Sequence, residues 1–210
     1  MDAARAAVVG HYMSALLRCL AVAAGLSTAS ALAQQADKPN SLFLIAKPTL
    51  IDPNFARTVV LVTQVEDAST VGVIINRPST LRLSQFLSDE FPTQNYRDAI
   101  YFGGPVMRQA IVALFRSETA PAAAAFHVLK GVYLTMHADN LQRLLAEPKA
   151  EYRLYAGFSG WAPRQLQSEF MRDSWYILPA DDKTVFRANT EGMWEELIER
   201  AMRLGPQARN

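Results

Sequence analysis

This chain contains few cysteines and few histidines, and neither basic nor acidic side chains are in clear excess. Its 210 residues contain one cysteine, Cys19, three histidines, and 21 basic against 20 acidic side chains. A single cysteine cannot close an intramolecular disulfide, which excludes a small disulfide-stapled scaffold. A formal net charge of +1 gives no bulk attraction to nucleic acid or to an anionic membrane surface. Half of the residues are hydrophobic, which excludes a disordered chain and is typical of one compact domain.

The first 33 residues have the order of a secretory signal peptide. A basic Arg18 precedes the apolar stretch Cys19–Leu26, and small and polar residues then lead to Ala31-Leu32-Ala33. This order predicts cleavage after Ala33, whether translation starts at Met1 or at Met13. The apolar stretch is far shorter than the roughly 20 residues of a membrane-spanning helix. We therefore expect a periplasmic or secreted protein with no stable membrane anchor. The alternative is an ordinary N-terminal extension on a cytoplasmic protein.

Removal of residues 1–33 would leave 177 residues with 19 acidic and 19 basic side chains and no cysteine. Residues 34–41 are polar and contain Pro39, which predicts a short flexible lead-in. No second linker and no repeat follows in the sequence. A single domain is therefore expected over 42–205, with a short tail at 206–210, and a chain of this length can bury a self-sufficient core.

Short runs of β-branched and aromatic residues predict the strands. They cover Leu42–Ala46, Thr58–Val62, Val71–Asn76, Ala99–Phe102, Ile111–Phe115, Val132–Thr135, Tyr152–Ala156 and Trp175–Leu178. Several of these runs are almost continuously apolar, which indicates strands that are covered on both faces.

Apolar residues at helical spacing predict the helices. They cover Leu83–Leu87, Ala138–Ala146, Pro163–Met171 and a final helix after Thr190, the residue expected to cap it. Strands dominate the first half of the chain and helices the second, which indicates the α+β class. The three tryptophans are expected to anchor the core.

The motifs of common catalytic sites are missing from the sequence. Gly157-Phe158-Ser159-Gly160-Trp161 lacks the last glycine of a nucleophile elbow, and no phosphate loop, dinucleotide motif or zinc-protease motif is present. His127 and His137 show no metal-ligand spacing, so we expect no metal site, no cofactor and no catalytic residue. Asp181-Asp182 follows Pro179 and precedes a helical segment, which favours a turn or helix cap over a catalytic carboxylate pair.

Polar or glycine-rich segments follow four of the predicted strands. The residues that we single out in them as candidate ligand-binding residues are Asp52, Asn54, Arg57, Asn76, Arg77, Gly103, Gly104 and Trp161. If the segments converge in space, the arginines and the glycine amides would hold a small anionic or peptide-like ligand. If they do not, the segments are tight turns whose arginines pair with Asp52 or with backbone carbonyls.

These segments, in this order, resemble the YqgE/AlgH family of bacterial proteins, and the resemblance spans 42–204. The matching residues are Phe43–Pro48, Asp52–Leu61, Gly72–Pro78, Tyr101–Val106, Tyr155–Trp161, Gln165-Leu166 and Trp175–Ala180. The resemblance implies an α+β fold in which a bifurcated mixed sheet curls into a pseudo-barrel with helices packed around it.

The resemblance implies no enzyme activity. One branch of the family is named for a transcriptional regulator of alginate synthesis, but a neutral mature charge and the lack of a helix-turn-helix pattern argue against direct binding to nucleic acid. Many members carry Cys-Glu-His after the second main strand, where this chain has Thr63-Gln64-Val65. A thiol, redox or metal role of that triad cannot operate here.

We therefore expect an exported, non-catalytic binding or regulatory domain that acts on a protein partner or a small ligand. One alternative is a cytoplasmic transcriptional regulator that acts through a protein partner. The other is an enzyme that uses Arg57, Arg77 and Asp52 on a small anionic substrate.

Overall fold

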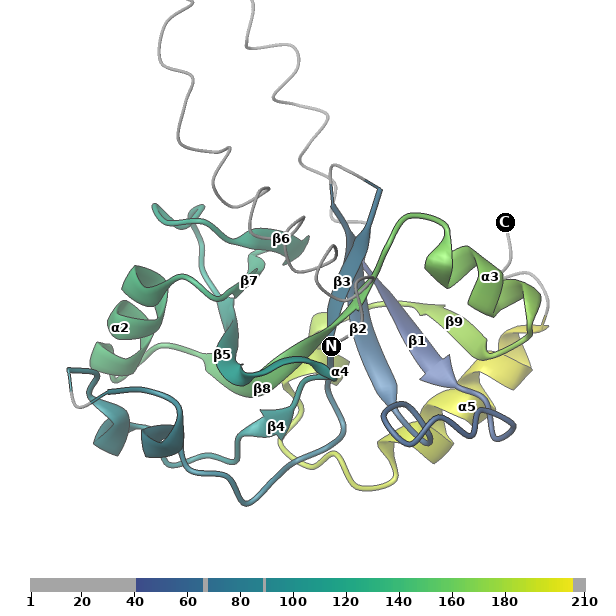
Figure 1. Ribbon diagram of the computed structural model, residues 1–210, viewed down its shortest axis with the longest axis horizontal. Coiled ribbons are helices and arrows are strands. Elements are labelled where there is room, and N and C mark those ends of the chain that lie inside the picture. The colour runs from purple at the N-terminus through teal and green to yellow at the C-terminus, as the bar shows by residue number, and fades with distance from the viewer. Residues whose placement is uncertain (1–40, 66–67, 89, 206–210) are drawn as a thin grey trace, which may run out of the picture.

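The computed structural model describes residues 41–65, 68–88 and 90–205, shown in Figure 1. The predicted signal peptide, its cleavage site, residues 34–40 and the tail lie outside these residues. The strands of the described part are β1 (Leu42–Ala46), β2 (Val59–Gln64), β3 (Thr70–Ile74), β4 (Tyr101–Phe102), β5 (Val106–Arg116), β6 (Phe126–Leu129), β7 (Val132–Thr135), β8 (Tyr152–Trp161) and β9 (Trp175–Pro179). The helices there are α2 (Ala138–Ala146), α3 (Gln165–Met171), α4 (Asp182–Phe186) and α5 (Met193–Leu204), with 3-10 turns η1 (Leu83–Gln85) and η2 (Thr93–Asn95).

The strands of the described residues form one mixed, branched sheet, which confirms the expected α+β class. Its main path runs β6-β7-β5-β8-β3-β2-β1-β9, and all neighbours on this path are antiparallel. β4 lies off the path and pairs with β8 in parallel. β6 and β9 end the path without pairing to each other, so the curled sheet is not closed.

The sheet branches along β8. The first half of β8 pairs with β5 on one edge and with β4 on the other, and its last three residues pair with β3. Between the two halves, Gly157 takes a positive φ of +70°. A Cβ on Gly103 would lie 2.2 Å from the Gly157 carbonyl oxygen. The branch therefore depends on glycine, because the two backbones approach too closely for a side chain.

Both faces of the sheet are buried. Successive side chains of a strand point to opposite faces, so β1 contributes Phe43 and Ile45 to the core that includes α5, and Leu44 and Ala46 to the core that includes Trp161 and Trp175. A third cluster packs the leucines of α2 against β5 and the start of β8. Burial on both sides explains why several strands read as almost continuous apolar runs.

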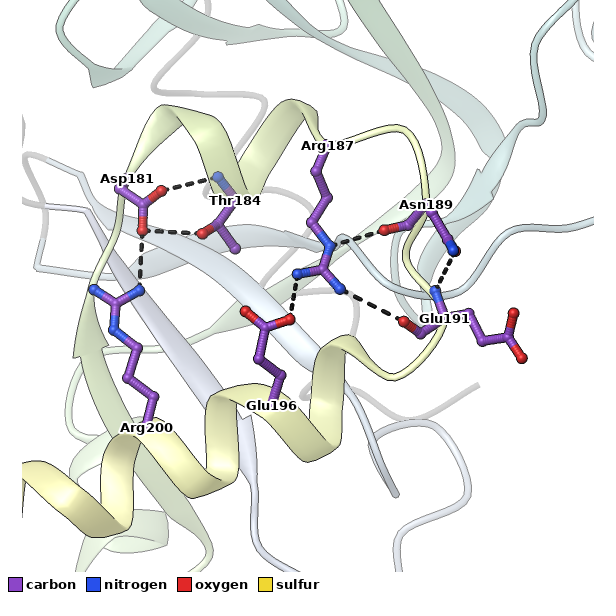
Figure 2. A network of polar contacts seen from close by, with 7 residues as sticks. All are labelled: Asp181, Thr184, Arg187, Asn189, Glu191, Glu196 and Arg200. Carbon is purple, nitrogen blue, oxygen red and sulfur yellow. Dashed lines mark hydrogen bonds and ion pairs between the residues drawn. The ribbon is translucent and has the colours of Figure 1, made fainter.

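Polar contacts join α4 and the residues at its two ends to α5 (Figure 2). Asp181 caps α4, since its carboxylate accepts hydrogen bonds from the Thr184 amide at 2.8 Å and from Arg200 of α5 at 3.3 Å. The prediction of a cap at Asp181 is thus confirmed. The predicted Thr190 cap is wrong, because the cap residue of α5 is Gly192, at φ +69°, and no side chain accepts there.

The sequence prediction missed β6 and made β5 and β8 too short. Among the described strands, β6 pairs only with β7, at one edge of the sheet. β8 continues through Gly157–Trp161, which was one of the possible tight turns, and β5 begins at Val106, directly after Gly103-Gly104-Pro105.

Candidate functional site

The loop that precedes β2 is held together by Asn54. The Asp52 carboxylate accepts hydrogen bonds from the Asn54 backbone amide at 2.8 Å and from its side-chain amide at 3.1 Å. The Asn54 side-chain oxygen accepts from Arg108 at 2.8 Å, and its backbone carbonyl accepts from Arg77 at 2.9 Å. All four polar atoms of Asn54 therefore have partners, and the residue connects two distant arginines to this loop.

The segment after β3 fastens the same loop to the sheet. The two terminal nitrogens of Arg77 donate to the carbonyls of Asn54 and Ala56, each at 2.9 Å. Asn76 accepts from the Val59 amide at 2.8 Å and donates to the Arg57 carbonyl at 3.0 Å. Burial lowers the pKa of the Arg77 guanidinium. The prediction that the arginines of these turns pair with carbonyls is confirmed for Arg77.

Phe102 lies against two arginines. The guanidinium carbon of Arg77 is 5.7 Å from the centre of the Phe102 ring, and that of Arg108 is 5.3 Å from it. We call Asn54, Arg77, Phe102 and Arg108 the Phe102 cluster. Both guanidinium groups lie within the range of cation–π attraction, so the ring helps to hold them in place.

Arg108 stands at an irregularity of β5. The register between β5 and β8 shifts between Val106 and Ile111, and Met107 has a positive φ of +47°. Such a bulge redirects side chains. Arg108 is exposed, and among the described residues its guanidinium bonds only to Asn54 and pairs with no carboxylate.

Phe102 and Arg108 are absent from the residues that sequence reasoning selected. The available signal was their position, since they flank the selected Gly103 and Gly104 on either side.

Arg57 faces a different partner. Its guanidinium carbon lies 4.3 Å from the centre of the Trp194 ring, and the group pairs with Glu195 of α5. The structure therefore directs Arg57 to α5 and Arg77 to the loop carbonyls, and does not bring the two guanidinium groups to a common partner.

Gly103 and Gly104 are buried in the branch of the sheet. The Gly103 amide donates to the Ala156 carbonyl at 3.0 Å, and its own carbonyl accepts from the Ile74 amide and the Ser159 hydroxyl. The predicted role of the Gly103 amide in ligand binding gains no support from this geometry, because that amide serves the sheet.

Trp161 packs against the loop that precedes β2. Its side chain is 1% exposed, and its ring centre lies 5.6 Å from that of Phe55 in the loop. The indole nitrogens of Trp161 and Trp175 both donate to Glu169 of α3, at 3.1 and 2.9 Å. The four selected segments thus contact one another, and the Phe102 cluster lies beside them, while Asp52 and Arg57 of the first segment are exposed as well.

The described residues show neither metal-binding nor membrane-spanning features. Over 41–65, 68–88 and 90–205, no group of three or more His, Cys, Asp or Glu side chains is placed to hold a metal ion. None of the helices in these ranges has the length and apolarity needed to cross a bilayer. His137 caps α2 by accepting a hydrogen bond from the Asp139 amide at 3.3 Å.

Comparison with known proteins gives consistent matches over this region. The sequence pattern of the AlgH-like family matches residues 43–204. A UPF0301 protein of Thermobifida fusca is 32% identical over 166 residues, covering 75% of this chain and 84% of that protein. A UPF0301 protein of Myxococcus xanthus is 31% identical and covers 78% and 90%, respectively.

Two solved structures are similar to this one. The solution structure of the AlgH protein from Pseudomonas aeruginosa has a TM-score of 0.63 at 31% identity, covering 79% of this chain and 88% of that one. A crystal structure of a protein from Corynebacterium diphtheriae has a TM-score of 0.61 at 24% identity, covering 78% and 86%, and shares the fold. None of these names states an activity.

Proposed function

We propose that this chain, which belongs to the AlgH-like family, is a non-catalytic binding protein that holds an anionic group at the Phe102 cluster. The anionic group belongs to a small ligand or to a protein partner, and a regulatory role would be exerted through that bound partner. The observation on which the proposal rests is that the Arg108 guanidinium is held by Asn54 and Phe102 and is exposed.

Arg108 is held in position, but most of its N–H donors make no hydrogen bond within the described residues. Asn54 takes one of its N–H groups, and the Phe102 ring centre lies 5.3 Å from its guanidinium carbon. A guanidinium has five N–H donors in a rigid fork that matches carboxylate and phosphate. The remaining donors face solvent, and holding the group in place beforehand reduces the entropy lost when an anion binds.

The chemistry of the cluster favours binding over catalysis. Its contacts involve guanidinium, amide and carbonyl groups and one aromatic ring. Guanidinium groups stay protonated in proteins and do not exchange protons as general acids or bases near neutral pH. The alternative of an enzyme acting on a small anionic substrate would depend on Asp52 for proton transfer, and one oxygen of that carboxylate already accepts two hydrogen bonds from Asn54.

The test is thermal unfolding of the full chain with increasing inorganic phosphate at constant ionic strength. We expect the melting temperature to rise with phosphate, because a ligand that binds only the folded state stabilises it. Arg108→Ala should weaken phosphate binding about tenfold through loss of charge-assisted hydrogen bonds. Arg108→Lys should retain part of the effect, since it keeps the charge but not the fork.

Arg143→Ala, which removes an exposed arginine from α2, is the matched control and should respond as the unmodified chain does. An equal phosphate response in Arg108→Ala would show that the ion acts elsewhere. No response to phosphate, acetate or citrate in the unmodified chain would contradict the proposal.

We also propose that the protein is exported, on the basis of the leader in residues 1–33. Cells of the native host would be fractionated and the N-terminus of the purified protein sequenced. We expect a periplasmic or secreted protein that begins at Gln34. A cytoplasmic protein that begins at Met1 or Met13 would instead support the cytoplasmic alternative.

A further inference from the structure

A second surface feature lies apart from the Phe102 cluster. A pocket of about 370 Å³ opens between the segment around η2, the turn after α2 and the start of β8. Figure 1 places α2, beside this pocket, at the left of the sheet, and β1, which leads to the Asn54 loop, at the right. The lining residues are Asn95, Tyr96, Arg97, Asp98, Leu145, Glu147, Pro148, Ala150 and Tyr152. The volume falls within the range of small-molecule sites.

Two tyrosines form the aromatic wall of this pocket. The ring centres of Tyr96 and Tyr152 are 5.6 Å apart, with the ring planes inclined by 30°. The Tyr96 hydroxyl donates to the Ala99 carbonyl at 3.1 Å and accepts from the Leu154 amide at 3.3 Å. Since this hydroxyl is used inside the protein, Tyr96 offers a ligand its ring alone.

Asp98 lines the same pocket as these tyrosines. Burial and, after it, the negative charge of Asp98 raise the pKa of the Tyr152 hydroxyl. The same carboxylate is one of the charges that act on Tyr96. Within the described ranges, Asp98 forms no ion pair with Arg97 or with any other cation. Its negative charge is therefore available to a ligand beside the aromatic wall.

Asn95 and Glu147 add acceptor oxygens to the same pocket. Asn95 donates its side-chain amide to the Leu145 carbonyl at 2.9 Å, which leaves its side-chain oxygen as an acceptor. One Glu147 oxygen accepts from the Lys149 amide at 3.2 Å, and the other bonds to nothing in the described part of the chain. Arg97 supplies the opposing positive charge. Two carboxylates against one guanidinium leave the pocket with a net negative charge.

We propose that this pocket binds a small molecule that carries a protonated primary amine on an aromatic body. The ammonium group donates to Asp98 and to the free acceptors of Glu147 and Asn95, and the body packs on the rings of Tyr96 and Tyr152. Aromatic faces attract cations, and charge-assisted hydrogen bonds to carboxylates orient them. This site takes a charge opposite to that bound at the Phe102 cluster, and its existence does not depend on the function proposed above.

The test uses three probes of one shape and different charge: benzylamine, benzyl alcohol and benzoate. Each is titrated into the full chain while backbone amide shifts are followed by ¹H–¹⁵N NMR. We expect benzylamine to bind saturably, with a dissociation constant on the order of millimolar. The shifts should be confined to 95–98 and 147–152. Benzyl alcohol and benzoate should bind about tenfold more weakly, since neither donates from a cation.

The variant is Asp98→Asn, which removes the charge at an exposed position and should leave the remaining spectrum unchanged. It should weaken benzylamine binding about tenfold. Glu118→Gln removes an exposed carboxylate from the turn after β5 and should have no effect. Preference for benzoate would show that Arg97 governs the pocket and would overturn the proposal. So would the absence of saturable shifts with benzylamine, or unchanged affinity in Asp98→Asn.

Discussion

Asn54 illustrates how one side chain organises a loop. Its amide group and its backbone link Asp52, two residues before it, with Arg77 and Arg108, which lie 23 and 54 residues further along the chain. The side chain of Asn is suited to this role because it has both donors and an acceptor. The turn between Asp52 and Asn54, which involves neighbouring residues, could be predicted from the sequence. The two arginine contacts require the folded sheet.

At Gly103 we expect even one methyl group to be destabilising. The Cβ of Gly103→Ala would lie 2.2 Å from the Gly157 carbonyl oxygen, and a backbone atom cannot move aside. We expect the free energy of unfolding, measured by urea denaturation, to fall by about 3 kcal/mol. Gly192→Ala is the control, since nothing lies within 4 Å of its added Cβ. Its positive φ alone should cost about 1 kcal/mol. A loss at Gly103 no larger than at Gly192 would contradict the close approach.

Among the elements, α5 is the one that closes the core over β1. It buries Met193, Trp194, Leu197, Ile198 and Ala201 along one face. This stripe has the spacing of an amphipathic helix, and its position was predictable from the sequence. The Trp194 nitrogen donates to the Ala46 carbonyl at 2.7 Å, so the helix is fixed to the end of β1 by a hydrogen bond as well as by packing.

We predict that Trp194→Ala lowers the free energy of unfolding by about 3 to 5 kcal/mol, because it leaves a cavity under α5. Trp194→Phe keeps a ring but leaves the Ala46 carbonyl without its donor, and should cost about 1 to 3 kcal/mol. Met202→Ala changes a residue that is 56% exposed on the same helix, and should stay within about 0.5 kcal/mol. Chemical denaturation measures all three. A value for Trp194→Ala close to that for Met202→Ala would show that α5 is peripheral.

The short helix α4 is held by charged contacts at both ends. Arg153 of β8, which is 9% exposed, donates to the Val185 and Arg187 carbonyls at 2.9 and 2.8 Å. Asp181 caps the other end and bonds to Arg200. Burial alone would raise the pKa of Asp181, but hydrogen bonds from Thr184 and Arg200 outweigh it and leave the pKa below its ordinary 3.8.

This lowered pKa predicts a pH-dependent stability. A carboxyl group whose folded pKa is depressed stabilises the fold above its unfolded pKa, about 3.9, and the contribution is lost as the pH falls through the folded value. At pH 7, Asp181→Asn should be less stable by about 0.5 to 1 kcal/mol, since Asn still caps the helix but lacks the charge. The difference should shrink below about pH 4. Urea unfolding at pH 7 and pH 3 checks this, and a difference that does not change with pH would contradict the assignment.

At the scale of the whole molecule, the branch of the sheet brings the four selected segments together. β8 carries Gly157 at the branch and Trp161 at its end, and it runs beside β3, β4 and β5, which lead to Arg77, Phe102 and Arg108. A single long strand thus connects segments that lie far apart along the chain. Sequence reading placed these segments at strand ends. Only the pairing of the strands shows which side chains meet.

Local signals were enough to predict several elements to the residue. β1 and β7 have the predicted bounds, and α2 covers Ala138–Ala146 as predicted, with Pro148 shortly after it. These predictions succeeded because alternation, helical spacing and breakers act within a few residues. β6 was missed although Phe126 and Val128 are residue types common in strands. The fold class and the family follow from motif order, which is also a property of the sequence alone.

The sequence by itself determined the apolar strands, the amphipathic helices, the near-zero net charge and membership of the AlgH-like family, because each depends on residue type and order. The tertiary structure alone decided which polar groups are free. It directed Arg57 to α5, buried Gly103 in the sheet and left Arg108 exposed on Phe102. It also formed the pocket of Tyr96, Asp98 and Tyr152. The physical reason is that a hydrogen bond or a desolvated charge depends on neighbours from distant parts of the chain, which become neighbours only in the folded sheet.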